Sequence, residues 1–154
     1  MTSPKLLLAI SICTLTCFPS AIAQERGPWS AANKTARSVT GDVVLSNDKI
    51  AINFASFPMA QIRPLAPAEV SALFNPDSAP ADGASHLYRL SIPASQKFLR
   101  KNTLCGSDDT QWLVTYVSGR SLELAFFSGD KMPVFTLDAV SNSTSLCGIY
   151  SYSR

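Results

Sequence analysis

Residues 112–126 read WLVTYVSGRSLELAF, and this stretch decides the fold class. Its first six residues form a strongly β-prone run, and Ser118-Gly119-Arg120 has the composition of a tight turn. After the turn, apolar side chains alternate with Glu123 and Ala125, which is the period of a half-buried strand. The pattern therefore predicts an antiparallel hairpin.

Similar patterns extend outward from this hairpin in both directions. The predicted strands are 39–46, 49–56, 59–65, 86–92, 112–117, 122–126 and 146–152. Two segments stay open: residues 95–103 fit a helical turn or a loop, and residues 133–140 fit a short strand or a helix. Many short strands separated by turn residues favour an all-β fold, an antiparallel β-sandwich or a small barrel. No helices separate the strands regularly, which argues against a parallel sheet.

Residues 67–74 are the one segment with the signals of a short helix. Pro67 suits the first helical position, Glu69 lies in the first turn where the helix dipole favours an acid, and Asn75-Pro76 ends the segment. Residues 75–85 follow with the composition of a loop.

The N-terminus reads as a secretory signal peptide over residues 1–23. Lys5 supplies the positive charge, residues 6–10 open an apolar run, and Ala21-Ile22-Ala23 is a small-x-small cleavage pattern before Gln24. The apolar run is shorter than the roughly 20 residues that a membrane-spanning helix needs. The sequence therefore predicts a periplasmic or secreted protein, with no transmembrane span in the mature chain.

The rest of the 154-residue chain divides into two parts. Residues 24–37 are polar and aperiodic, which predicts a flexible N-terminal arm in which Trp29 alone could pack on the core. Residues 38–154 are predicted to form a single β domain. The formal net charge is +2 without a basic stripe, so no nucleic-acid partner is expected.

Cysteine usage follows from the predicted export. Cys17 lies in the signal peptide, and the residues before it lack the pattern of a lipid-anchored cysteine. Cys105 and Cys147 each stand between a leucine and a glycine. Two cysteines in an oxidising compartment predict one disulfide, and their separation is far wider than that of a redox-active Cys-x-x-Cys pair. With one histidine in the chain, a zinc site would also need a carboxylate ligand.

No catalytic constellation stands out. His86 is the only histidine, but a histidine base needs an orienting acid and a nucleophile, and no Gly-x-Ser-x-Gly motif singles out a serine. Asp108 and Asp109 could bind a hard cation, but adjacent acids in a loop are more typical of a solvated turn. We therefore predict no catalytic residues, no metal site and no cofactor.

Several motifs resemble a family of small exported proteins of Gram-negative bacteria. They are SVTGDVVLS at 38–46, LYRL at 87–90, NTLCG at 102–106, LAFFSG at 124–129 and LCGIYSY at 146–152. The family has no established activity, so the resemblance implies a periplasmic or secreted setting and assigns no functional residue.

These observations favour a non-enzymatic binding or interaction module whose partner is a protein or an envelope component. Loops on a β scaffold commonly carry recognition, so loops 75–85 and 106–111 are the expected contact regions. Two alternatives stay open: a small periplasmic hydrolase using His86, and a structural subunit of an envelope assembly that pairs through an edge strand.

Overall fold

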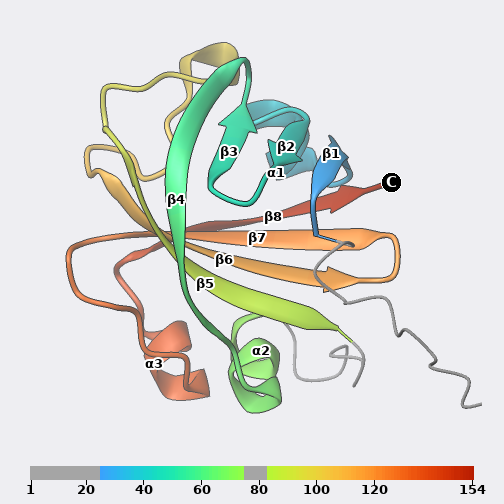
Figure 1. Ribbon diagram of the computed structural model, residues 1–154. Helices are drawn as coiled ribbons and strands as arrows, with labels where there is room; N and C mark the ends of the chain where they lie inside the picture. The colour runs from blue at the N-terminus through green and yellow to red at the C-terminus, as the bar shows by residue number, and fades with distance from the viewer. Residues whose placement is uncertain (1–24, 75–82) are drawn as a thin grey trace, which may run out of the picture.

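Antiparallel strands close into an eight-stranded barrel, in which each strand pairs with the next in the sequence and β8 pairs with β1 (Figure 1). The computed structural model describes residues 25–74 and 83–154. The elements are β1 Gly27–Ala31, α1 Lys34–Val39, β2 Val43–Leu45, β3 Lys49–Ile52, β4 Ala55–Pro64, α2 Pro67–Leu73, β5 Ala84–Ile92, a 3-10 turn Leu99–Lys101, β6 Thr110–Ser118, β7 Ser121–Ser128, α3 Leu137–Ser141 and β8 Leu146–Ser153. The predicted signal peptide and residues 75–82 of the predicted loop lie outside the described residues.

The predicted β6–β7 hairpin and the predicted helix are both confirmed. β6 and β7 pair from Thr110↔Ser128 to Ser118↔Ser121 around a turn in which Gly119 has a φ of 57°. α2 begins at Pro67, and the backbone N–H of Ala66 donates to Glu69 Oε2 at 2.9 Å. The mostly β, antiparallel fold is also confirmed, and of the two architectures predicted the barrel is the one observed.

Apolar side chains fill the barrel interior and form its main core. Alternate residues along each strand point inward, and the fully buried ones include Ile50, Leu113, Leu124, Phe126 and Tyr152. An eight-stranded barrel is just wide enough for its side chains to fill. The interior of this barrel is therefore a hydrophobic core.

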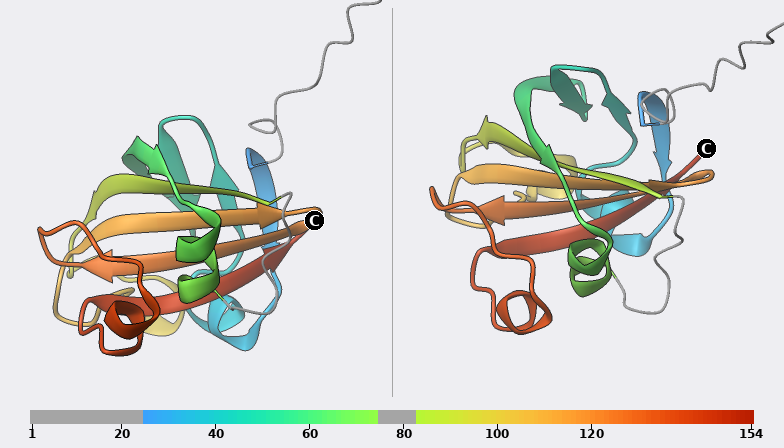
Figure 2. Two further views of the ribbon diagram at one scale, coloured as in Figure 1. Left: turned by 90° about the horizontal axis from the view of Figure 1, so that it is seen from below. Right: turned by 60° about the horizontal axis from the view of Figure 1, so that its bottom comes forward.

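A second apolar layer lies on the outside of one half of the barrel. Phe127 points away from its neighbour Phe126 and joins a separate cluster that includes Trp112, Phe135 and the α2 residue Leu73. Figure 2 shows α2 and α3 on this outer side of the sheet. The two helices make β6 and β7 buried on both faces, which explains their nearly continuous apolar sequence.

The N-terminal segment differs from its prediction as a flexible arm. Residues 27–31 form β1, which pairs with β2 through Gly27–Trp29 and with β8 through Ser30 and Ala31. α1 follows, capped by the Asn33 side chain, which accepts from the Ala36 N–H at 2.8 Å. Trp29 is fully buried and joins the interior core. The segment is ordered by barrel closure, a long-range contact that its polar composition does not reveal.

The predicted strand 49–56 extends too far toward the C-terminus. β3 ends at Ile52, and the two-residue turn Asn53-Phe54 connects it to β4, with Ile52 paired to Ala55. Both turn residues have positive φ angles, 47° and 69°, as in the type I′ turns that suit the twist of a hairpin. β4 then runs without interruption to Pro64.

Three further segments complete the comparison. In the open segment 133–140, residues 133–136 belong to neither a strand nor a helix, and α3 begins at Leu137. Residues 95–103 contain the 3-10 turn. The predicted strand 39–46 is reduced to 43–45 because Val39 ends α1.

Within the described part of the chain, no helix is long and apolar enough to cross a membrane.

Candidate functional site

The predicted disulfide is present. Cys105 and Cys147 are bonded, with their Cα atoms 4.9 Å apart. The bond ties the loop before β6 to the start of β8, two segments that are 42 positions apart in the chain. Its role is therefore structural, because it fixes two chain segments at one end of the barrel.

His86 has a carboxylate partner that the sequence did not reveal. Its position two residues before Tyr88 on β5 places both side chains on the inward face of the barrel. Glu25 lies two residues before the start of β1, where its Oε2 is 2.9 Å from His86 Nδ1 and its Oε1 accepts from the Tyr88 hydroxyl at 3.1 Å. The Trp29 indole N–H donates to the Glu25 carbonyl at 2.9 Å. Closure of the barrel by β1 thus brings Glu25 to His86 across 61 positions of sequence.

Glu25 is a buried carboxylate held in its charged form. Only 6% of the residue is exposed. Burial acts to raise the pKa of the Glu25 carboxyl, but hydrogen bonds from His86, Thr115 and Tyr88 outweigh it, so the pKa is lowered. Burial and the Glu25 charge raise the pKa of Tyr88. Because an ionised carboxylate only accepts hydrogen bonds, His86 Nδ1 carries the proton and its Nε2 faces away from Glu25.

A carboxylate on Nδ1 is the orientation that a histidine base requires, but the space beside this pair is small. The adjoining cavity measures about 30 Å³ and is lined by Glu25, His86 and Tyr88 together with Arg26, Ser46, Asn47 and Gln61. Such a volume holds about one water molecule, whereas small-molecule sites usually measure about 300–1,000 Å³. The space beside His86 is therefore far smaller than a usual small-molecule site.

The acidic loop 106–111 serves the local backbone. Asp109 Oδ1 accepts from the Ala94 N–H at 2.8 Å, which fixes the loop after β5. Asp108 is exposed. Among residues 25–74 and 83–154, no group of three or more His, Cys, Asp or Glu side chains is placed to hold a metal ion.

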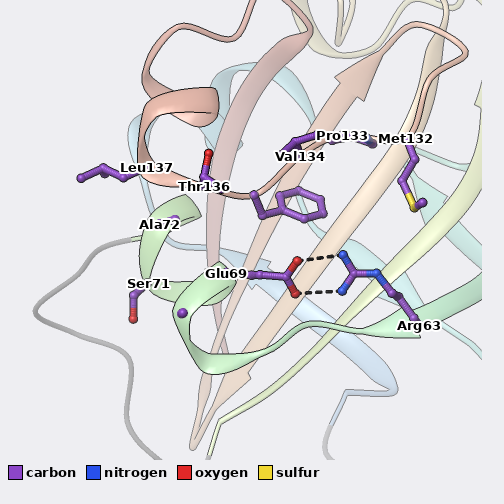
Figure 3. Close-up of a pocket in the computed structure, with 11 residues that line it drawn as sticks. Arg63, Glu69, Ser71, Ala72, Met132, Pro133, Val134, Thr136 and Leu137 are labelled. Carbon is purple, nitrogen blue, oxygen red and sulfur yellow. Dashed lines mark hydrogen bonds and ion pairs between the residues drawn. The ribbon is translucent and has the colours of Figure 1, made fainter.

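An apolar hollow lies outside the barrel, between α2 and the segment that leads into α3. This groove has a volume of about 770 Å³ (Figure 3). Its lining comes from Arg63, from α2 (Ala68, Glu69, Ser71 and Ala72) and from residues 132–137. Two segments some sixty positions apart in the sequence therefore form its two walls.

One ion pair accounts for the charge of this groove. Arg63 donates from both terminal nitrogens to the Glu69 carboxylate, each at 2.8 Å. This bond lowers the pKa of Glu69 and raises that of Arg63. The guanidinium also lies 5.9 Å from the centre of the Phe135 ring. The pair is bidentate, so the two charges neutralise each other within the groove wall.

The wall formed by residues 132–137 exposes large apolar side chains. Met132 is 50% exposed, Val134 65% and Leu137 63%, and the three lie within one short segment. Apolar side chains gathered in this way, beside a groove, are typical of an interaction surface. The sequence offered one signal: Met132 to Phe135 is an apolar run that contains a proline, which is unsuited to the middle of a sheet.

Comparisons with protein-family models, with curated proteins and with solved structures find no match for this chain.

Proposed function

We propose that this protein is a non-enzymatic binding module that recognises a partner protein through the groove between α2 and residues 132–137. The observation that supports this most directly is the exposure of Met132, Val134 and Leu137 along one wall. Exposed apolar side chains lower solubility and add little to the stability of the isolated chain, so contact with a partner gives them a role. This location differs from the loops 75–85 and 106–111 that the sequence favoured.

The groove also has the rigidity that recognition requires. Its base is the outer apolar layer, in which Phe135 is buried against Phe127, with ring centroids 5.8 Å apart. The Arg63–Glu69 pair links β4 to α2 across the same region. A surface that is already ordered loses less conformational entropy on binding than a flexible loop does.

Site-specific photo-crosslinking tests this function. Benzoylphenylalanine is placed at Val134 in the groove wall, and at Val44 on β2 as the control, because Val44 is 43% exposed on another part of the barrel. In cells that express the full chain, the probe at position 134 should give a discrete adduct that excess unlabelled protein competes away. Equal and diffuse labelling from both positions would count against the proposal.

A hydrolase that uses His86 is the second candidate, because Glu25 orients the ring through Nδ1. The cavity of about 30 Å³ beside the ring gives it less support. Loss of a hydrolytic activity in His86→Ala, with the circular dichroism spectrum unchanged, would favour this candidate over the binding module. An envelope subunit that pairs through an edge strand has the least support, because β1 and β8 pair to close the barrel.

The proposed setting is outside the cytoplasm, in the periplasm or the medium. It is supported by the signal-peptide pattern of residues 1–23, and the disulfide is consistent with an oxidising compartment. Intact-mass analysis of protein recovered from the periplasm and the medium tests it. The expected mass begins at Gln24, and a mass that retains residues 1–23 or carries acyl chains on Cys17 would contradict it.

A further inference from the structure

The backbone beside the groove has unused hydrogen-bonding groups. Residues 132–135 lie between β7 and α3 and belong to neither a strand nor a helix. Among the described residues, no backbone–backbone hydrogen bond uses the N–H groups of Met132, Val134 and Phe135 or the carbonyls of this stretch. Backbone hydrogen bonding resumes at Thr136, whose carbonyl accepts from the Val140 N–H of α3 at 2.9 Å.

Met132 and Val134 are exposed, whereas Phe135 is buried, and open space lies on either side of the exposed residues. Met132 to Val134 line the groove next to α2 and also a second hollow of about 580 Å³ that reaches residues 142–145. A segment that pairs as a strand becomes extended, and its alternate residues then direct their backbone groups to the same edge. Pro133 has no N–H, so the edge that carries Met132 and Val134 is the one able to pair fully with another strand.

Charge limits what can enter the groove. Arg63 and Glu69 are its two charged lining residues, and they satisfy each other at 2.8 Å. A charged group entering the groove would lose hydration without gaining a free counter-ion. Charge complementarity therefore selects an uncharged occupant.

We infer that the groove binds an extended, uncharged, apolar segment of a partner protein, which adds as a strand to residues 132–135. This inference rests on the proposed binding function and specifies its ligand. In strand addition, main-chain hydrogen bonds supply affinity and pockets for alternate side chains supply specificity. Here Met132 and Val134 offer the backbone groups, and the apolar groove beside α2 takes the alternate side chains.

A backbone-directed substitution separates strand addition from ordinary apolar contact. Val134→Pro removes one N–H and keeps most of the side chain, whereas Val134→Ala keeps the N–H and removes more of the side chain. If a strand adds, Val134→Pro should weaken binding by about two- to tenfold more than Val134→Ala, which corresponds to one hydrogen bond. If binding uses side chains alone, Val134→Ala should be at least as damaging.

The probe is a displayed library of random short peptides, selected on the full chain and counter-selected on a Val134→Asp variant. The selected peptides are expected to be uncharged and rich in β-branched residues. Fluorescence anisotropy then measures their affinity for the wild type, for Val134→Pro and for Val134→Ala. A winner resynthesised with N-methyl groups on alternate amides should lose about tenfold or more in affinity. This second measurement uses the unaltered protein, so it holds even if Val134→Pro disturbs the fold.

The outcomes distinguish the two proposals. Amphipathic helical winners, or winners whose affinity is unchanged by N-methylation, would overturn strand addition and retain the groove as a binding site. A library without winners would also overturn it, because no linear segment would then fit. The proposed binding function is tested independently of strand addition, and it fails if the benzoylphenylalanine at position 134 gives no specific adduct.

Discussion

The two halves of the barrel differ in what covers their outer face. On β6 and β7 most residues are buried whether they point inward or outward, because α2 and α3 pack on the outside. On β4 the inward Phe57 and Met59 are buried, while outward residues such as Pro58 and Ile62 are exposed. The sequence reflects this difference, since a sheet covered on both faces has continuous apolar runs and a sheet covered on one face alternates.

The two halves also differ in what their outer side chains contribute to stability and to the candidate binding groove. The covered half carries the second apolar layer and, at its margin, the groove with its exposed Met132 and Val134. The uncovered half has Phe54 at its hairpin tip, which is fully exposed at 104% of its reference area. Substitutions in the two halves should therefore differ widely in their effect.

The largest effect is expected in the covered half. Phe126→Ala empties part of the interior and Phe127→Ala part of the outer layer, and each should lower the free energy of unfolding by about 3–5 kcal/mol. Ile62→Ala on the uncovered face should change it by about 0.5 kcal/mol or less. Urea denaturation measures all three. A small effect for Phe127→Ala would mean that the outer layer contributes little to the core.

Loss of the disulfide should come next. Cys147→Ser, and the double variant that also carries Cys105→Ser, should each lower the free energy of unfolding by about 2–5 kcal/mol relative to the wild type. Thiol labelling of the denatured, unreduced wild type should detect no free cysteine. An unchanged midpoint of denaturation in the double variant would show that the bond adds nothing to stability.

Substitution of Glu25, which is bonded to His86 and Tyr88, should give a smaller effect on stability, and that effect should depend on pH. The pKa of Glu25 is lowered on folding, so its contribution is present above the ordinary pKa of about 4.5 and is lost as the pH falls through the lowered value. Glu25→Gln should cost about 1–3 kcal/mol at neutral pH and should flatten the decline of stability in acid.

Glu123 provides a control of opposite sign. Burial raises the pKa of this carboxyl on β7, against the effect of a hydrogen bond from Ser151. Its charged form is therefore unfavourable in the fold, and Glu123→Gln should raise stability at neutral pH. Denaturant titrations across the acid range measure both variants, and a loss of stability in both would contradict the assignment of Glu25 and Glu123 to opposite roles.

The smallest effect is expected at the tip of the uncovered half. Phe54 has a φ of 69°, a conformation that is strained for an aromatic residue and favourable for glycine. Phe54→Gly should therefore raise the free energy of unfolding by about 1 kcal/mol. Phe54→Ala is the matched control, because it removes the ring and keeps the strain. Equal effects of the two variants on the melting temperature would show that the strain is negligible.

Much of the fold could be predicted from local patterns. The β6–β7 hairpin follows from its alternation and its turn, α2 from Pro67 and Glu69, and the disulfide from two cysteines in an exported chain. Local rules succeed here because each feature depends on neighbours in sequence or on a single possible pairing. The rule for strands was less reliable at Asn53-Phe54, where a turn is formed without a glycine.

The candidate site was predicted only in part. His86 stood out as the single histidine, but its partner Glu25 belongs to a segment expected to be a flexible arm. Residues 133–137 lie in the segment 133–140, for which the sequence fits a short strand or a helix, and nothing in that segment indicates that α2 forms the opposite wall.

The sequence by itself determined the β character of the chain, its hairpin, its short helix and its disulfide, because period, turn chemistry and cysteine count are local or compositional. Only the tertiary structure decided the rest. Closure of the barrel buried Trp29 and brought Glu25 to His86, and packing of the outer layer set residues 132–137 beside α2. Contacts between residues so far apart leave no periodic signal, since their formation depends on how the whole chain excludes water from its apolar faces.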